Sequence, residues 1–237
     1  IIIVFKQRGI LFMNGFSLDG KLFKGLTKAG DFIILAVITF LFCLPVVTIG
    51  AALTAAFYSG IKLVRDEEGY VHKDFWKSFK MNFVQGFLIE LIHVIIGFLL
   101  YIDLRASVQW GLVQGSQIGV IFVFVVIGVM AIWAAVMLYS FAMLSRYDNN
   151  VIVTLKNALI VSVHHLPQTI IMLIATVGLV YFSCIYFTAF IVTIPLILYV
   201  DSFIFSSIFK HLEKNQASAN AEAEAIEDTN ENKEEEK

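Results

Sequence analysis

The sequence predicts an all-α protein: a polytopic integral membrane helical bundle of about five membrane segments, the first of them broken, with amphipathic interfacial helices. Two properties of the composition indicate this class. Hydrophobic residues make up 59% of the 237 residues and charged residues only 15%, whereas soluble domains are about 45–50% apolar and about 25% charged. The mean hydropathy is +0.82. This composition excludes a disordered chain, a basic nucleic-acid-binding protein and an ordinary soluble enzyme.

Long runs without Asp, Glu, Lys or Arg, or with only one of them, locate the membrane segments. A spanning helix needs about 20 mostly apolar residues, and backbone in contact with lipid has to be helical. We expect segments at 32–61, 83–103 and 118–144, and two more within the run 169–207. We divide that run near Phe187–Ala189, although Pro195 leaves open a single kinked helix.

The first segment contains a predicted helix break at Pro45–Gly50, because proline removes a helical hydrogen bond and clashes with the preceding turn. Two rows of small residues follow in the sequence. One is Ala52, Ala56 and Gly60, in the first segment, and the other is Gly128, Ala131 and Ala135, in the third. Small residues at helical spacing let helices approach closely in lipid. We expect both rows to pack helices, within the chain or against a partner.

Two amphipathic stretches flank the membrane segments. In residues 71–83, one side of a helix is aromatic and the other basic. The residues that define this interfacial or docking helix are Phe75, Trp76, Lys77, Phe79, Lys80 and Phe83. Residues 18–28 have a similar pattern, with Ser17 as the predicted N-cap. Such helices lie at a membrane surface; the alternative is that they dock a cytoplasmic protein.

The positions of lysine and arginine indicate which loops face the cytoplasm. Fifteen lysines and arginines lie at or before Lys214. If the first segment crosses once, the better arrangement puts nine of these charges inside and six outside. If it enters the membrane and returns at Pro45–Gly50, 14 lie inside and one outside. Both topologies stay open at this point. Both place loops 62–80 and 145–168 and the C-terminus in the cytoplasm.

Three ionisable residues fall inside the apolar runs: Glu90, His93 and Asp201. Charge in the middle of a bilayer is costly, so such residues are functional candidates. Glu90 and His93 are three residues apart and share a helix face. We expect the three to form one intramembrane polar cluster, with a structural role or a role linked to protons or substrate.

No catalytic motif accompanies these features. The sequence contains no P-loop, no G-x-S-x-G and no H-E-x-x-H. We therefore expect no enzymatic activity, no cofactor, no metal site and no nucleic-acid partner, with membrane lipid around most of the chain. Residues 213–237 contain nine acidic and three basic residues, and we expect them to form a disordered, acidic cytoplasmic tail.

Three blocks of sequence carry a family resemblance. They are Leu44–Ala52 (LPVVTIGAA), Lys62–Tyr70 (KLVRDEEGY) and Phe75–Phe83 (FWKSFKMNF), with Lys156–Ala158 and His165–Pro167 further along. In this order and at this spacing they resemble the YesL-like family of bacterial membrane proteins, over a membrane domain at 13–212. Residues 1–12 lie outside the resemblance, and we expect them to be an N-terminal extension.

The resemblance implies a membrane component of complex-carbohydrate uptake. The family is typical of Gram-positive bacteria, and its genes commonly neighbour those for ATP-binding-cassette (ABC) importers, sugar-binding proteins and glycoside hydrolases. We therefore expect a non-enzymatic accessory subunit of an ABC-type oligosaccharide importer in the cell membrane, with permease subunits as partners. The alternative is a stand-alone small transporter or channel that uses Glu90, His93 and Asp201.

Overall fold

The computed structural model describes residues 21–186 and 190–235, and all regular structure in these ranges is helical. The main helices are α2 (Lys21–Cys43), α3 (Ile49–Val64), α4 (Val71–Met81), α5 (Phe83–Val108), α6 (Gln117–Arg146), α7 (Val151–His164), α8 (Leu166–Ile185) and α9 (Phe190–Glu235). Six helical stretches in the described part are long and apolar enough to cross a membrane. The predicted class, a polytopic membrane helical bundle, is confirmed. The predicted extension at 1–12 and the predicted cap Ser17 lie outside the described residues.

The first predicted segment is two helices, not one. Pro45 follows the end of α2, and a short 3-10 turn, η1 (Val46–Thr48), precedes α3. The hydroxyl of Thr48 donates to the carbonyls of Phe42 (2.5 Å) and Pro45 (2.8 Å), which supplies hydrogen bonds that the interrupted helix lacks. The count of about five segments is therefore corrected to six, because proline divides the apolar run 32–61 into two helices.

Both ends of this first segment lie on the same side of the molecule. The Nζ of Lys28, near the start of α2, lies 2.7 Å from Oδ1 of Asp66, just after the end of α3. The two helices also pack against each other, so they form an antiparallel hairpin. Of the two topologies that the charge count left open, this geometry favours the one in which the chain enters and returns at Pro45.

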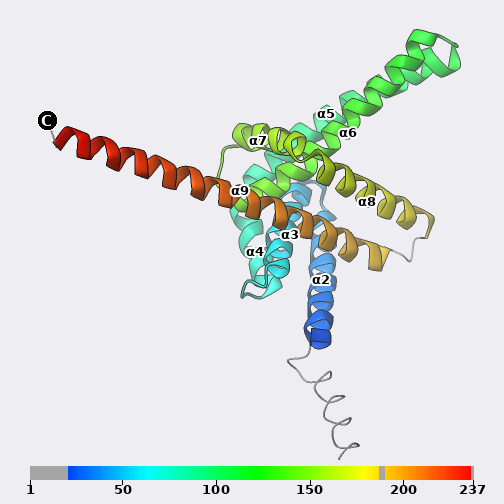
Figure 1. Cartoon of the computed structure of the whole chain (residues 1–237). Coiled ribbons are helices and arrows are strands. Elements are labelled where there is room, and N and C mark those ends of the chain that lie inside the picture. Colours follow the sequence, from blue (N-terminus) through cyan, green and yellow to red (C-terminus); the bar gives the residue numbers. More distant parts are fainter. Residues whose placement is uncertain (1–20, 187–189, 236–237) are drawn as a thin grey trace, which may run out of the picture.

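Helices α5 and α6 form a second hairpin, which projects from the rest of the molecule (Figure 1). A π-helical turn, η2 (Gln109–Val113), continues α5 at the tip, and the hydroxyl of Ser116 accepts a hydrogen bond from the N–H of Gly119 (3.3 Å). A Cβ on Gly111 would lie 2.5 Å from the Gly119 carbonyl carbon, so only glycine permits this close approach. The predicted segments 83–103 and 118–144 are confirmed, each with a longer helix.

Helices α8 and α9 form the third hairpin. α8 ends at Ile185 and α9 begins at Phe190, so the predicted division of the run 169–207 is confirmed, with its central residues outside the described part. The hydroxyls of Ser183 and Thr193 are hydrogen-bonded across the hairpin. α9 continues to Glu235. The acidic tail, predicted to be disordered, is thus helical as far as Glu235, because alanine and glutamate, its commonest residues, favour helix.

The helix at the centre of the fold is α3. It contacts α2, α4, α5, α6 and α9, and 56% of its candidate span is buried, against 17% in α5, α6 and α8. Its Phe57 packs edge-on against Phe205 of α9, with ring centroids 5.3 Å apart. Figure 1 shows the α5–α6 and α8–α9 hairpins diverging from this centre. Their exposed apolar side chains form the surface that lipid or a partner helix would contact.

Candidate functional site

Glu90 lies near a close approach of α3 and α5. Gly50 and Gly86 face each other there, and a Cβ on Gly86 would lie 2.8 Å from the backbone nitrogen of Ala51. This close approach lets Oε2 of Glu90 accept a hydrogen bond from the N–H of Gly50 at 2.9 Å. N–H groups in a first turn lack partners in their own helix, and a carboxylate there is favoured by the helix dipole. Glu90 therefore caps α3 from a neighbouring helix. Gly50, which was predicted to be part of the helix break, lies inside α3.

His93 lies one turn further along α5 and is only 3% exposed. Its Nε2 is 3.3 Å from Oγ of Ser140 on α6, and Ser140 donates its own hydrogen to the carbonyl of Val136 (2.6 Å). Ser140 therefore accepts from the Nε2–H of His93, which leaves Nδ1 of the neutral ring as an acceptor. In the described part of the chain, neither this Nδ1 nor the buried Nε1–H of Trp133 has a hydrogen-bond partner.

A cavity of about 380 Å³ lies beside these groups, between α3, α5 and α6. The polar side chains that line it are Glu90, His93 and Trp133. The rest of its wall is apolar and includes Leu53 and Phe141. A mostly apolar cavity with a few converging polar groups is the usual form of a small-molecule site. Sequence analysis identified Glu90 and His93 but missed Trp133 and Ser140, which no motif distinguishes from other residues of a membrane helix.

Asp201 lies elsewhere, in the α8–α9 hairpin. It is 2% exposed, and its two carboxyl oxygens accept from the hydroxyl of Thr176 at 3.2 and 3.3 Å. Among the residues that the structure describes, no three His, Cys, Asp or Glu side chains lie close enough together to hold a metal ion. The residues predicted to form one polar cluster therefore occupy two places: Glu90 and His93 at the cavity, and Asp201 beside α8.

The two rows of small residues have different surroundings. The row in α3 (Ala52, Ala56 and Gly60) is buried inside the chain, and a Cβ on Gly60 would lie 3.2 Å from Cβ of Ser202 in α9. In the row in α6, Ala135 is buried but Gly128 and Ala131 are exposed. In the part of the chain that the structure describes, no atom lies within 4 Å of a Cβ placed on Gly128. The first row thus packs helices within the chain, while two members of the second row are exposed and available to contact a partner.

The predicted docking helix α4 packs much of its aromatic side against protein. Phe75 and Phe79 are buried, and the ring centroid of Phe79 lies 4.9 Å from that of Phe42 in α2. The exposed members of the predicted set are Trp76, Lys77, Lys80 and Phe83. A partner at this surface would therefore meet a basic patch with one indole and one phenyl ring, not a continuous aromatic face.

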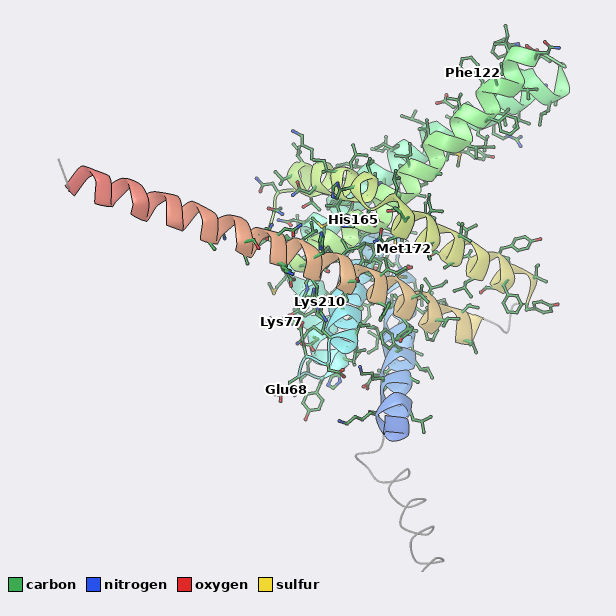
Figure 2. The ribbon with its side chains drawn as sticks, viewed as in Figure 1. Glu68, Lys77, Phe122, His165, Met172 and Lys210 are labelled. Carbon is green, nitrogen blue, oxygen red and sulfur yellow. The ribbon has the colours of Figure 1, made fainter. Side chains whose placement is uncertain are left out.

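Ion pairs connect the charged ends of several helices, a feature that the sequence analysis did not identify. The pairs are Lys28–Asp66, Lys62–Asp74, Arg65–Glu67, Arg65–Glu213 and Arg146–Glu67. They join α2, α3, α4, α6 and α9. Figure 2 shows Glu68, Lys77 and Lys210 well away from Phe122, which lies far out on the α5–α6 hairpin. The lysine-rich loops thus gather on one side, distant from the hairpin tip.

Tyr147 follows α6 on this charged side, and its ring centroid lies 5.8 Å from that of Phe209 in α9. Burial raises the pKa of Tyr147, and the Glu213 carboxylate raises it further, whereas Arg146 and Arg65 lower it. An ordinary tyrosine, with a pKa of about 10, is already uncharged at neutral pH, and the raised pKa extends this range further upward. Tyr147 therefore closes the charged side as a neutral, mostly apolar group.

Comparison with protein families gives one match. Residues 23–104 match a family described as "Protein of unknown function, DUF624". The DUF624 match covers less than half of the chain, from α2 to most of α5, and so includes the α2–α3 hairpin, Glu90 and His93. No curated protein and no solved structure shows significant similarity to the chain. The match supports a link to an uncharacterised family. The region of this chain that matches it contains helices long and apolar enough to cross a membrane.

Proposed function

We propose that the chain is a non-enzymatic accessory subunit of an ABC-type oligosaccharide importer in a bacterial cell membrane. The resemblance of its sequence blocks to the YesL-like family supports the importer, and the DUF624 match supports membership of an uncharacterised membrane family. An accessory subunit needs a surface for a partner within the membrane. The projecting α5–α6 hairpin supplies one.

The observation that carries this proposal is the free part of the α6 row. Glycine in the middle of a helix costs about 1 kcal/mol relative to alanine, and within residues 21–186 and 190–235 Gly128 has no neighbour that requires it. Ala131 continues the same exposed face. Small residues on a lipid-facing helix allow close packing of another helix, so we infer that a permease helix packs here.

Co-purification from native membranes in a mild detergent tests this interface. We expect the wild-type chain to bring down importer permease subunits, and Gly128→Leu with Ala131→Leu to recover about fivefold less, because leucine separates the helices. Gly178→Leu on α8 is the matched control. In the described part of the chain a Cβ there also meets nothing within 4 Å, but its small neighbour Ala175 is half-buried instead of exposed like Ala131. If the wild type recovers no permease subunit, the proposal fails.

We further propose that the lysine-rich side is cytoplasmic. With six spans, loops 62–80 and 145–168 and both termini lie on one side. That side then carries 16 of the 17 lysines and arginines, and Arg105 lies on the other. The ion pair between Lys28 and Asp66 supports this arrangement, and positive residues accumulate on the cytoplasmic side of membrane proteins.

Cysteine labelling in cells tests the orientation. In a background with Cys43→Ala and Cys184→Ala, we expect an impermeant maleimide to label Gln114→Cys, at the hairpin tip, in intact cells. Glu68→Cys, in the loop after α3, is expected to react only after the membrane is permeabilised. Both positions are exposed on the protein surface. A difference in labelling therefore reports the side of the membrane and not burial within the protein. The reverse pattern would refute the proposed orientation.

A stand-alone transporter or channel is the second candidate, favoured by the cavity beside Glu90 and His93. It has less support because Asp201 is not part of that site and Glu90 already caps α3. Solute flux into liposomes that contain only this chain, and its loss in Glu90→Gln, would favour this candidate over an accessory role.

A further inference from the structure

The cavity between α3, α5 and α6 contains polar groups for which the described part of the protein provides no partner. Nδ1 of His93 and Nε1–H of Trp133 are both buried without a hydrogen bond, and their rings lie near each other, with centroids 6.3 Å apart. Both side chains line the cavity. Buried polar groups nearly always have a protein or water partner, so a molecule in the cavity would supply what these two groups lack.

The two nitrogens require opposite partners. The indole N–H of Trp133 only donates. Nδ1 of His93 accepts, because the bond to Ser140 holds the ring proton on Nε2. An ammonium group cannot accept and an ether cannot donate, whereas a hydroxyl does both. The carboxyl group of Glu90 lines the same cavity and offers a further acceptor.

The walls of the cavity indicate which kind of molecule would present this hydroxyl. Its walls are apolar, with side chains such as Leu53, Met137 and Phe141, and the helices around it are candidate membrane spans. A volume of about 380 Å³ is in the range of small-molecule sites. An uncharged alcohol with an alkyl chain matches both the walls and the surrounding lipid, and it avoids the cost of bringing a charge into the membrane.

We propose that this cavity binds a membrane-soluble alcohol, whose hydroxyl donates to Nδ1 of His93 and accepts from Nε1–H of Trp133. The alkyl part lies against the apolar wall. Within the described ranges no other group bonds to either nitrogen, so one hydroxyl satisfies both. This site does not depend on the accessory role, because the proposed permease contact at Gly128 and Ala131 is formed by other residues.

The probes for this site are 1-octanol and octyl methyl ether, which have similar shapes but differ in the hydroxyl hydrogen. The full chain, with Trp76→Phe and Trp110→Phe, is placed in phosphatidylcholine nanodiscs so that Trp133 is the remaining tryptophan. We expect octanol to change the Trp133 fluorescence at a concentration in the bilayer about fivefold lower than the ether requires, because only octanol can donate to His93.

His93→Leu is expected to remove this fivefold difference, and Ser140→Ala, which no longer holds the ring proton on Nε2, to reduce it. His165→Leu is the matched control, because His165 is also buried but lies outside the cavity; it should keep the difference. Thermal unfolding shows which variants are folded, and Ser140→Ala replaces His93→Leu if the latter does not fold. Equal titrations for the two probes in the wild type, or an unchanged difference in the folded cavity variants, would overturn the proposal.

Discussion

Replacing Gly86 with alanine is expected to reduce the free energy of unfolding by about 2–3 kcal/mol, the upper part of the range for overpacked sites. A Cβ at this position would lie 2.8 Å from the nitrogen and 2.9 Å from the Cα of Ala51. These are backbone atoms in the first turn of α3, so they cannot move aside as a flexible side chain does. The helices must separate, which also weakens the hydrogen bond between Glu90 and Gly50. Thermal unfolding in detergent, followed by far-ultraviolet circular dichroism, measures the loss.

Two other glycines in lipid-facing helices serve as controls for this prediction. A Cβ on Gly97 would meet the outer ring atoms of Trp133 at 2.7 and 3.0 Å, and a ring can shift, so Gly97→Ala should cost less. A Cβ on Gly178 would meet nothing within 4 Å. Gly178→Ala should therefore stabilise the helix by up to about 1 kcal/mol. If the three substitutions have equal effects, the close contact between α3 and α5 does not limit stability.

Replacing Arg65 with methionine is expected to cost about 2 kcal/mol. Its side chain, 10% exposed, connects the end of α3 to α9. It donates to the hydroxyl and carbonyl of Ser206 at 3.3 and 3.4 Å and pairs with Glu213 at 3.1 Å. Methionine preserves much of the packing but removes these hydrogen bonds and the ion pair. The same unfolding measurement, with limited proteolysis of α9, tests the loss of this connection.

The ion pair itself should supply the smaller part of this effect. Glu213 is 47% exposed, and exposed pairs contribute about 0–1 kcal/mol, so we expect Glu213→Gln to cost less than Arg65→Met. Lys210→Met removes an exposed cation from the same helix and should change stability by less than about 0.5 kcal/mol. If Lys210→Met lowers the free energy of unfolding as much as Arg65→Met does, the specific bonds of Arg65 are not the cause of the loss.

Local patterns in the sequence were enough to predict several features. The runs without charge located the spans, because lipid requires helical backbone and about 20 apolar residues. The proline in the first apolar run marked the α2–α3 break at Pro45, whereas Pro195, in a later run, lies inside α9. Gly50 was predicted as part of that break, but it lies within α3. Glycine is common both at a helix end and at a close contact between helices. Only the structure, which places Gly86 of α5 opposite Gly50, shows that Gly50 has the second role.

Contacts between helices could not be predicted in the same way. Glu90, His93 and Asp201 are all ionisable residues in apolar runs, yet Asp201 lies beside Thr176 while the other two line a cavity. Likewise the row at Ala52 is buried and Gly128 is exposed. Sequence spacing determines which residues share a face of one helix, but it does not determine which neighbour that face meets.

The sequence by itself determined that this is a helical membrane chain and where its apolar runs lie. These properties depend on transfer of residues between water and lipid, which is a local property of composition. Only the tertiary structure decided that Glu90 caps α3, that Arg65 holds α9, and that His93 and Trp133 share a cavity. Those relations depend on the angles and distances at which helices cross, and these are set by side chains distant in the sequence.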